Sequence, residues 1–510
     1  MSPTPPVPQE ATARTLAAHP DPDQLRRQAK ELLRAWRAGD PEALARAAPY
    51  RLPPPPRLTQ AQLVIAREMG QPSWTALMAE VESRRNGALN DLAYTEQALA
   101  LALGRGFDAP RPAQALAMLQ ARPGLRPPAL RLLLGEAADI PHDHPLPPWN
   151  APPLALVAFS SLATIGFEDA LLAQLQRLLA AGADPNAGLP DPGSADRPLP
   201  VLYGAVARAR SAAMVQVLLD AGADPNDNES LYHAVEQPDR RIVAALVAAG
   251  ARWHGTNALF RQLDFDSLPH LQQVLDLGAD VNEFLGSDGT RALQHAVLRG
   301  RSLPHLQLLV ERGADIAALD HHGHSLAWFA ARAGRPDVLA WLAPLGQHPP
   351  ASLYERFLAA CAAADEPAAR ALLASHPGLI TELSDLDRQL LPEQAQRGVI
   401  DSVRLMLALG WPVDVPGPWQ ASALNQAAFR GDAAMAALLL QHGARWSERN
   451  GYGGTALGSC LHAGCNEPVP GGDYAAVLAL LLADGAPAPV DDDQLGDEMA
   501  AVVAEHNGPA

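Results

Sequence analysis

The sequence predicts an all-α solenoid in which short pairs of helices repeat along the chain and stack on one another. The first observation is a recurring glycine, found at Gly182, Gly222, Gly250, Gly278, Gly313, Gly346, Gly378, Gly410, Gly443 and Gly485. Its mean spacing, (485 − 182)/9 or about 33.7 residues, is typical of stacked repeats. The second observation is that apolar segments with helical spacing precede these glycines. Stacked repeats favour an extended surface for binding a macromolecule over a catalytic pocket.

Residues 422–446 show the plan of one repeat. Apolar residues from Ala423 to Ala428 recur at helical spacing and predict a first short helix. Gly431 ends it, because glycine enters the left-handed conformation at little cost. Asp432 is placed to cap a second, more apolar helix, and Gly443 ends that helix. Neither helix can bury its apolar face alone, so neighbouring repeats must stabilise each other.

The same plan is visible at 290–313, 325–346 and 454–485. The segments GADPN (182–186), GADPN (222–226) and GADVN (278–282), together with RALQHA (291–296) and ESLYHA (229–234), resemble the hairpin and first-helix motifs of the ankyrin repeat. This resemblance covers roughly 151–487. It implies an ankyrin-type α-solenoid of ten to twelve helix-turn-helix repeats with short β-hairpin loops, preceded by a small helical module.

The segments outside the regular repeats suggest how the chain is divided. The proline-rich residues 1–20 predict a disordered N-terminus. A helical module is expected at 21–90, degenerate capping repeats at 91–150, the solenoid at 151–487 and an acidic C-terminal cap at 488–510. Within the solenoid, the proline- and glycine-rich residues 186–200 predict a long loop, and the 28-residue spacings leave little room for hairpins after Gly222 and Gly250.

The helical module contains a possible helix-turn-helix. We expect a helix pair at 23–48, followed by a helix capped by Thr59 and ended by Gly70, and another capped by Ser73. Residues 21–85 carry 11 basic and 8 acidic side chains. The last helix, however, has no arginine or lysine in its first two turns, where DNA contacts would be made. A capping or docking module is therefore favoured over DNA binding.

Composition indicates a cytosolic protein of bacterial origin. No window holds about 18 uninterrupted apolar residues, so no transmembrane helix is expected, and the N-terminus lacks a signal-peptide pattern. Three cysteines argue against a disulfide framework. Lys30 is the only lysine beside 38 arginines, which resembles the codon bias of a GC-rich bacterial genome. The net charge of −17 disfavours nucleic acid and anionic lipid and mildly favours a basic partner.

The sequence contains no phosphate loop, no GxSxG elbow and no HExxH motif. Cys460, His462 and Cys465 are plausible zinc ligands without a fourth, and the histidines of 321–324 suit a solvated hairpin tip. The acidic run 491–493 lacks the glycine and glutamate spacing of a calcium loop. We therefore expect no enzyme activity, no catalytic residues, no metal and no cofactor.

The hypothesis that remains is non-catalytic recognition of another protein by a monomeric scaffold. Its concave groove would be lined by hairpin tips and first helices, with a few anchor residues supplying most of the affinity. The residues expected to contact the partner lie on hairpins, where side chains need not serve the core. They are Asn226, Asp227, Glu229, Asn282, Glu283, Phe284, Asp320, His322 and Tyr452. For Trp253 and Trp446, packing on the neighbouring repeat is the favoured interpretation.

Two other functions stay open at this point. The chain could be a secreted effector or a toxin- or immunity-associated protein that uses its repeats to find a target. It could also be a DNA-binding regulator that acts through residues 59–85. The sequence does not identify the partner.

Overall fold

The computed structural model describes residues 15–17, 20–106, 108–136, 140–191, 194–285, 289–348, 352–466, 468–489 and 495–506. By its internal contacts the chain forms two units. Unit 1 comprises residues 1–85 and 330–510, and unit 2 comprises residues 86–329. The division shows that the N-terminal helices group with the C-terminal repeats, which the sequence does not reveal.

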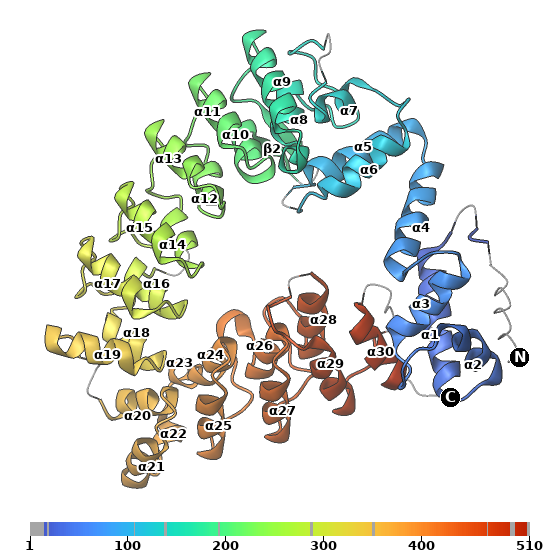
Figure 1. The fold of residues 1–510 in the computed structure, drawn as a ribbon. Coiled ribbons are helices and arrows are strands. Elements are labelled where there is room, and N and C mark those ends of the chain that lie inside the picture. The colour runs from blue at the N-terminus through green and yellow to red at the C-terminus, as the bar shows by residue number, and fades with distance from the viewer. Residues whose placement is uncertain are drawn as a thin grey trace, which may run out of the picture. The chain divides into compact units, whose positions relative to one another are not determined.

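Unit 2 is a row of helix pairs. Its helices are α5 (Asp91–Leu103), α6 (Pro112–Ala121), α7 (Pro128–Leu133), α8 (Pro153–Ala158), α9 (Glu168–Ala180), α10 (Val201–Tyr203), α11 (Ala212–Asp220), α12 (Ser230–Ala234), α13 (Arg241–Ala248), α14 (Ala258–Leu263), α15 (Leu268–Asp276), α16 (Ala292–Leu298), α17 (Leu303–Glu311) and α18 (Leu326–Arg332). The first helices of successive pairs contact one another, as do the second helices, giving two parallel rows (Figure 1).

Unit 1 contains the N-terminal helices and the C-terminal repeats. These helices are α1 (Pro22–Arg37), α2 (Pro41–Ala47), α3 (Leu58–Glu68), α4 (Trp74–Ala88), α19 (Pro336–Leu342), α20 (Leu353–Ala362), α21 (Glu366–Ser375), α22 (Leu379–Glu382), α23 (Asp385–Arg388), α24 (Leu390–Arg397), α25 (Ile400–Ala408), α26 (Ala423–Arg430), α27 (Ala433–Gln441), α28 (Ala456–Asn466), α29 (Tyr474–Ala483) and α30 (Asp497–His506). Here α20, α24, α26 and α28 form the row of first helices.

The repeat at 422–446 folds as its residues predict. The Ser422 hydroxyl accepts a hydrogen bond from Asn425 N at 3.3 Å and starts α26, which Gly431 ends at φ +68°. Asp432 accepts from Met435 N at 3.0 Å and starts α27. The prediction of an all-α, ankyrin-type solenoid is therefore confirmed for the individual repeat.

Nine of the ten periodic glycines adopt the left-handed conformation that ends a helix, with φ between +75° and +102°. Gly378 is the exception. Its φ is −80°, because α21 already ends at Ser375 and Gly378 precedes the short helix α22. The prediction of a helix-ending glycine is wrong at this position.

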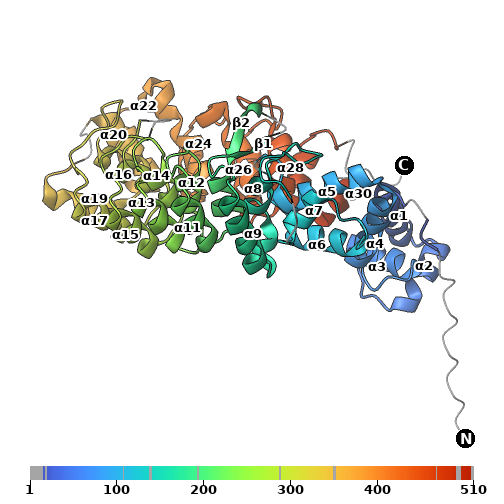
Figure 2. The ribbon, with the colours of Figure 1, turned by 90° about the horizontal axis from the view of Figure 1, so that it is seen from above.

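The C-terminal helix α30 connects the two hydrophobic clusters of unit 1. Met499 and Val503 pack into the core of the last repeats, whereas Ala500 packs into the core of the N-terminal helices. Arg37 of α1 forms an ion pair with Glu505 at 3.1 Å. Figures 1 and 2 accordingly show α30 beside α1 and α3. The predicted cap is a helix, but one of its faces is covered rather than exposed.

Three local expectations differ from the structure. Residues 186–200 contain an antiparallel hairpin, β1 (Gly188–Asp191) and β2 (Ser194–Pro200), because Leu189 and Leu199 pair and are both buried. The helix α3 begins at Leu58, so Thr59 lies inside it and Arg57 occupies the cap position. Leu16, within the segment expected to be disordered, packs into the N-terminal core.

The helix pair at 23–48 and the cap at Ser73 are confirmed by α1, α2 and the bond from Ala76 N to the Ser73 hydroxyl at 3.1 Å. The acidic run 491–493 and residues 1–14 lie outside the described residues. None of the helices in the described ranges has the length and apolar character needed to span a bilayer.

Candidate functional site

The predicted hairpin asparagines tie consecutive repeats together. Asn226 donates to Gly250 O at 3.3 Å and accepts from Arg252 N at 2.9 Å. Asn282 makes the equivalent bonds to Gly313 O and from Asp315 N, both at 2.9 Å. The amides therefore span the gap from one hairpin to the next. Both side chains are half-buried and bond to backbone groups, so they stabilise the hairpins without packing in the core.

The acidic residues of the same set are also engaged within the chain. Asp227 accepts from Ser230 N at 2.7 Å and caps α12, and burial raises the pKa of its carboxyl. Glu229 lies 3.6 Å from His233 Nε2, and Glu283 accepts from Gly255 N at 2.6 Å. Asp320 accepts from His324 N at 2.7 Å. Their first role is to shape hairpins and helix starts.

The remaining three predicted residues differ in how accessible they are. Phe284 is half-buried, with its ring 4.1 Å from that of His321 and beneath the guanidinium of Arg291. His322 is exposed, and Tyr452 is 83% exposed. The described structure does not bring these three and the six polar residues together into one cluster, because they lie on hairpins of different repeats.

Trp253 packs on the neighbouring repeat as expected, with 9% of its surface exposed and its indole N–H donating to Leu277 O at 3.0 Å. Trp446 is half-buried against the core of unit 1. The Cys460 thiol is buried, which raises its pKa to about 12, while Cys465 is exposed. Within the described ranges no group of three or more potential ligands could hold a metal ion.

A network of charged side chains runs across the first helices of unit 2 and was not predicted from the sequence. Glu236, after α12, lies 3.0 Å from His233 and 2.8 Å from Arg261 of α14. Arg261 also contacts Asp264 at 3.1 Å, and Asp264 in turn lies 3.4 Å from His295 of α16. His233 and His295 occupy the same position in ESLYHA and RALQHA, and this repetition is the signal that could have predicted the network.

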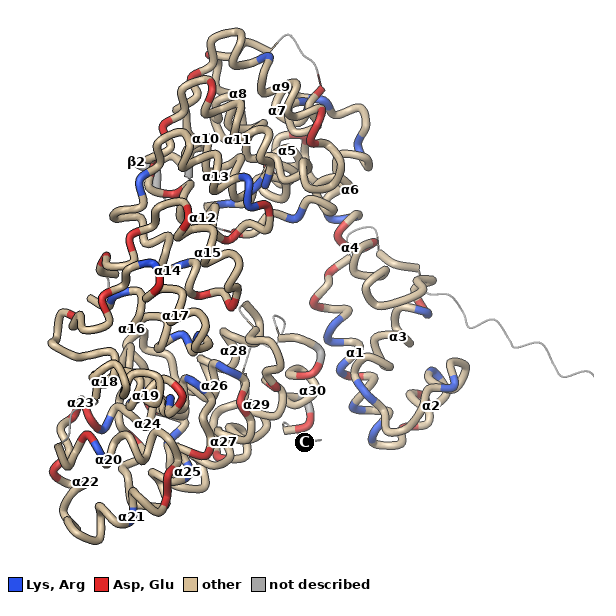
Figure 3. The backbone as a smooth tube through the Cα atoms, turned by 60° about the vertical axis from the view of Figure 1, so that its left-hand side comes forward, with Lys and Arg blue, Asp and Glu red and all other residues tan. Residues whose placement is uncertain are grey.

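Two glutamates perturb the titration of His233. Burial of the ring opposes protonation, but Glu229 and Glu236 outweigh it and raise the pKa of His233 to about 9. The pKa of Glu236 is lowered, because His233 and Arg261 outweigh the effect of burial. His233 is therefore a cation at neutral pH. Figure 3 shows acidic and basic positions interspersed through the repeats, in keeping with such internal pairing.

A cavity of about 750 Å³ lies in unit 1 between the first helices α24, α26 and α28 and their hairpins. It is lined by side chains that include the predicted Tyr452, together with Trp419, Gln426, Arg430 and His462. This volume is within the range of ordinary ligand pockets. The sequence analysis did not single out Trp419, although it is an aromatic residue at a hairpin tip like Tyr452.

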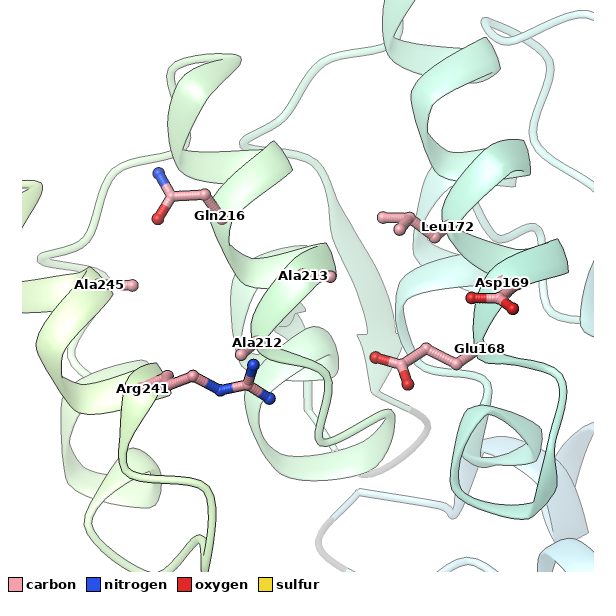
Figure 4. A pocket seen from close by; sticks show the side chains of 8 residues that line it. All are labelled: Glu168, Asp169, Leu172, Ala212, Ala213, Gln216, Arg241 and Ala245. Atoms are coloured by element: carbon pink, nitrogen blue, oxygen red, sulfur yellow. The ribbon is translucent and has the colours of Figure 1, made fainter.

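A second depression, of about 470 Å³, lies among the second helices of unit 2. Figure 4 shows Glu168 and Asp169 on α9 facing the Ala212 end of α11, with Arg241 on α13 at the other side. Arg241 is paired with Asp239 at 2.7 Å, and Glu168 accepts from the Ser211 hydroxyl at 2.6 Å. Arg241 and Glu168 therefore have local partners, and Asp169 is exposed, so the cavity of unit 1 is the better candidate site.

Comparisons with known proteins give structural matches only. No family model matches the sequence, and no curated protein matches it. The ankyrin repeat domain of human ASB11 aligns at 23% identity and a TM-score of 0.22, covering 45% of this chain and 99% of that domain. The ankyrin repeat domain of Bcl-3, a member of the IkappaB family, aligns at 25% identity and a TM-score of 0.19, covering 39% and 92%. The repeat geometry of the chain itself agrees with the motifs of this repeat class.

Proposed function

The chain is an ankyrin-repeat-like protein, and from that premise we propose that it is a non-catalytic scaffold that recognises a partner protein through its first helices and hairpins. The observation that carries the proposal is the open cavity of unit 1, where Trp419 and Tyr452 are 59% and 83% exposed. Large aromatic side chains are enriched among the residues that dominate binding energy. Exposed aromatics beside a cavity therefore favour a binding surface.

The two buried cysteines argue against catalysis by either of these thiols. Burial raises the pKa of both Cys361 and Cys460 to about 12, so neither is a thiolate at neutral pH. A thiol in that state is a poor nucleophile.

Among the predicted contact residues, we propose that His322 and Tyr452 meet the partner directly, since they are the most exposed. The six polar residues would act by holding the hairpins in position. The excess of acidic side chains favours a partner with a basic surface outside the cavity.

The test compares the full-length protein with the Trp419→Ala/Tyr452→Ala variant as baits for proteins from its native lysate. The matched control is Tyr354→Ala, which removes a partly exposed aromatic ring of α20 outside the cavity. We expect proteins retained by the wild type and the control to be lost from the double variant. If all three folded baits retain the same proteins, this surface is not the binding site.

DNA binding through residues 59–85 is less well supported. Arg84 of α4 is held by Glu80 at 2.7 Å and by Leu16 O at 2.7 Å, and Arg46 pairs with Glu68 at 2.8 Å. These pairs engage cations that phosphate contacts would require. A gel shift of the full chain at about 50 mM salt, where phosphate contacts are strongest, would reveal such an activity.

A further inference from the structure

The cavity of unit 1 has an aromatic rim made of two hairpin tips. Trp419 lies in the hairpin after α25, and Tyr452 lies in the hairpin after α27. The two hairpins are joined by a hydrogen bond from Gly451 N to Trp419 O at 2.7 Å. This bond fixes one tip relative to the other, so the rim is a defined surface.

Trp419 is held in a conformation that disfavours a bulky residue. Its φ is +56°, and the following Gln420 has the same value. The turn is closed by Gln420 N donating to Gly417 O at 3.0 Å and by Ala421 N donating to Pro418 O at 3.1 Å. A strained residue with an exposed aromatic ring is more typical of a functional position than of a structural one.

The polar wall of the cavity has hydrogen-bond donors to spare. Gln426 of α26 is 6% exposed, yet its Nε2 has no partner within the described residues. One turn later, Arg430 donates from Nη1 to Gln396 O at 3.2 Å, but its buried Nε has no partner there. By contrast, the neighbouring Asn425 donates to Glu448 O and accepts from the Ser459 hydroxyl. Two unused donors one helical turn apart need an acceptor.

The charge of the lining favours an anionic acceptor. The chain carries 56 acidic side chains, but none of the residues lining the cavity is acidic, and Arg430 is the lining side chain with a permanent charge. No ion pair of Arg430 is present among the described residues. A carboxylate can accept from both an amide and a guanidinium, and such charge-assisted bonds are the stronger ones.

We propose that this cavity binds an extended segment of a partner protein in which an aromatic or aliphatic side chain lies close to a glutamate or aspartate. The apolar side chain would pack between Trp419 and Tyr452, and the carboxylate would accept from Gln426 and Arg430. The lining spans three successive first helices, α24, α26 and α28. At roughly 10 Å between neighbouring helices this distance suits about six residues of extended chain. This inference rests on the proposed scaffold function and specifies its ligand.

The test uses a positional-scanning library of fluorescent hexapeptides, acetylated at the N-terminus and amidated at the C-terminus, titrated against the full-length protein by anisotropy. We expect selection of Glu or Asp at one position and of an aromatic or aliphatic residue near it. Replacing that acid by its amide should weaken binding about tenfold or more, because a hydrogen-bonded charge is lost. Higher salt should weaken the acidic peptide and leave its amide analogue little changed.

Three variants separate the two parts of the cavity. Arg430→Gln should remove the preference for the acid and keep the apolar preference, whereas Trp419→Ala/Tyr452→Ala should do the opposite. Arg370→Gln, which removes an exposed arginine from α21, is the charge-matched control and should bind like the wild type.

The proposal is overturned if the selected peptides show no acid preference, or if the preference survives in Arg430→Gln. It is also overturned if a parallel library with a free C-terminus binds and the amidated one does not, because the ligand is then a chain end. The same holds if no pool binds more tightly to the wild type than to the double variant. In each case, a lysate partner that is lost from the Trp419→Ala/Tyr452→Ala bait would still support the scaffold function. The two failures are therefore distinguishable.

Discussion

Replacing His233 by glutamine should destabilise unit 2, relative to the wild type, more at pH 6 than at pH 10. The ring is half-buried on α12, where 18% of the side chain is exposed, and it lies between Glu229 and Glu236. Glutamine keeps a polar side chain but cannot become a cation. The variant therefore isolates the contribution of the imidazolium. The other titratable or charged neighbours are Tyr203, Tyr232 and, through Glu236, Arg261.

The direction follows from the pKa of His233 in the two states. In the folded protein it is raised from 6.5 to about 9. Because the folded state binds the proton more tightly than the unfolded state, protonation stabilises the fold. This contribution is complete below pH 6.5 and is lost as the pH rises through about 9. Glu236 remains ionised across this window, since its pKa is lowered.

The gap between the two pKa values sets the magnitude. It corresponds to roughly 3 kcal/mol at the low-pH limit. Part of this free energy is offset, because two like-charged glutamates are held close to the same ring. We therefore expect the free energies of unfolding of wild type and variant to differ by about 1–3 kcal/mol more at pH 6 than at pH 10.

The assay combines an NMR titration of the histidine ring protons with urea unfolding of the full chain at pH 6, 7.5, 9 and 10. Hydrogen exchange of peptides covering 229–236 localises the effect to unit 2. A difference in stability between wild type and variant that does not change with pH, or a ring that titrates near 6.5, would refute the reasoning.

Three further predictions concern the hairpins and the thiols. Asn282→Ala removes bonds to two backbone groups of the next repeat. It should lower the free energy of unfolding by about 1–2 kcal/mol, measured as faster hydrogen exchange at 313–320. The control Gln272→Ala, at an exposed position, should leave the exchange unchanged. Trp419→Asn relieves the strain of the left-handed backbone and should leave the stability unchanged or raise it by up to about 1 kcal/mol. Peptide affinity should fall at least tenfold. A clear loss of stability would show that the ring is needed for the fold. Cys465 should react with a thiol reagent at once and the buried Cys361 and Cys460 only on unfolding, so rapid reaction of all three would contradict their burial.

The sequence predicts the repeat well because its signals are local. A capping residue, a helical apolar pattern and a terminal glycine lie within one stretch of about 25 residues at 422–446, and each acts through neighbouring backbone groups. Where a signal is weak, the prediction fails. Gly378 keeps the period but not the conformation, and the prolines of 186–200 conceal the pairing of Leu189 with Leu199.

The grouping of distant segments could not be predicted in this way. The packing of α30 against α1 joins residues more than 400 apart, as in the ion pair of Arg37 with Glu505. Likewise, Arg261 of α14 pairs with Glu236 of the preceding repeat. These contacts depend on which faces meet after stacking, which periodicity alone does not specify.

The hairpins beside the cavity lack the asparagine that ties other hairpins together, as do those after Gly250 and Gly313. In GADPN and GADVN the asparagine, four residues after the glycine, ties each hairpin to the next, as Asn282 does. The residues at this position after Gly410 and Gly443 are Asp414 and Ser447. Asp414 instead pairs with Arg445 at 3.2 Å.

The tips in this part of the chain are joined by the bond from Gly451 N to Trp419 O, as His321 N and Gly289 O join two hairpins of unit 2. That link places Trp419 at a turn whose backbone disfavours it, with its ring exposed above the first helices. In these hairpins the departure from the repeat motif, which weakens the sequence signal, accompanies the aromatic rim. Asp414→Asn places an amide where it can donate to Gly443 O and accept from Arg445 N, as Asn282 does with Gly313 O and Asp315 N. It should slow hydrogen exchange in this hairpin and weaken peptide binding; unchanged exchange and binding would show that the missing amide has no part in forming the cavity.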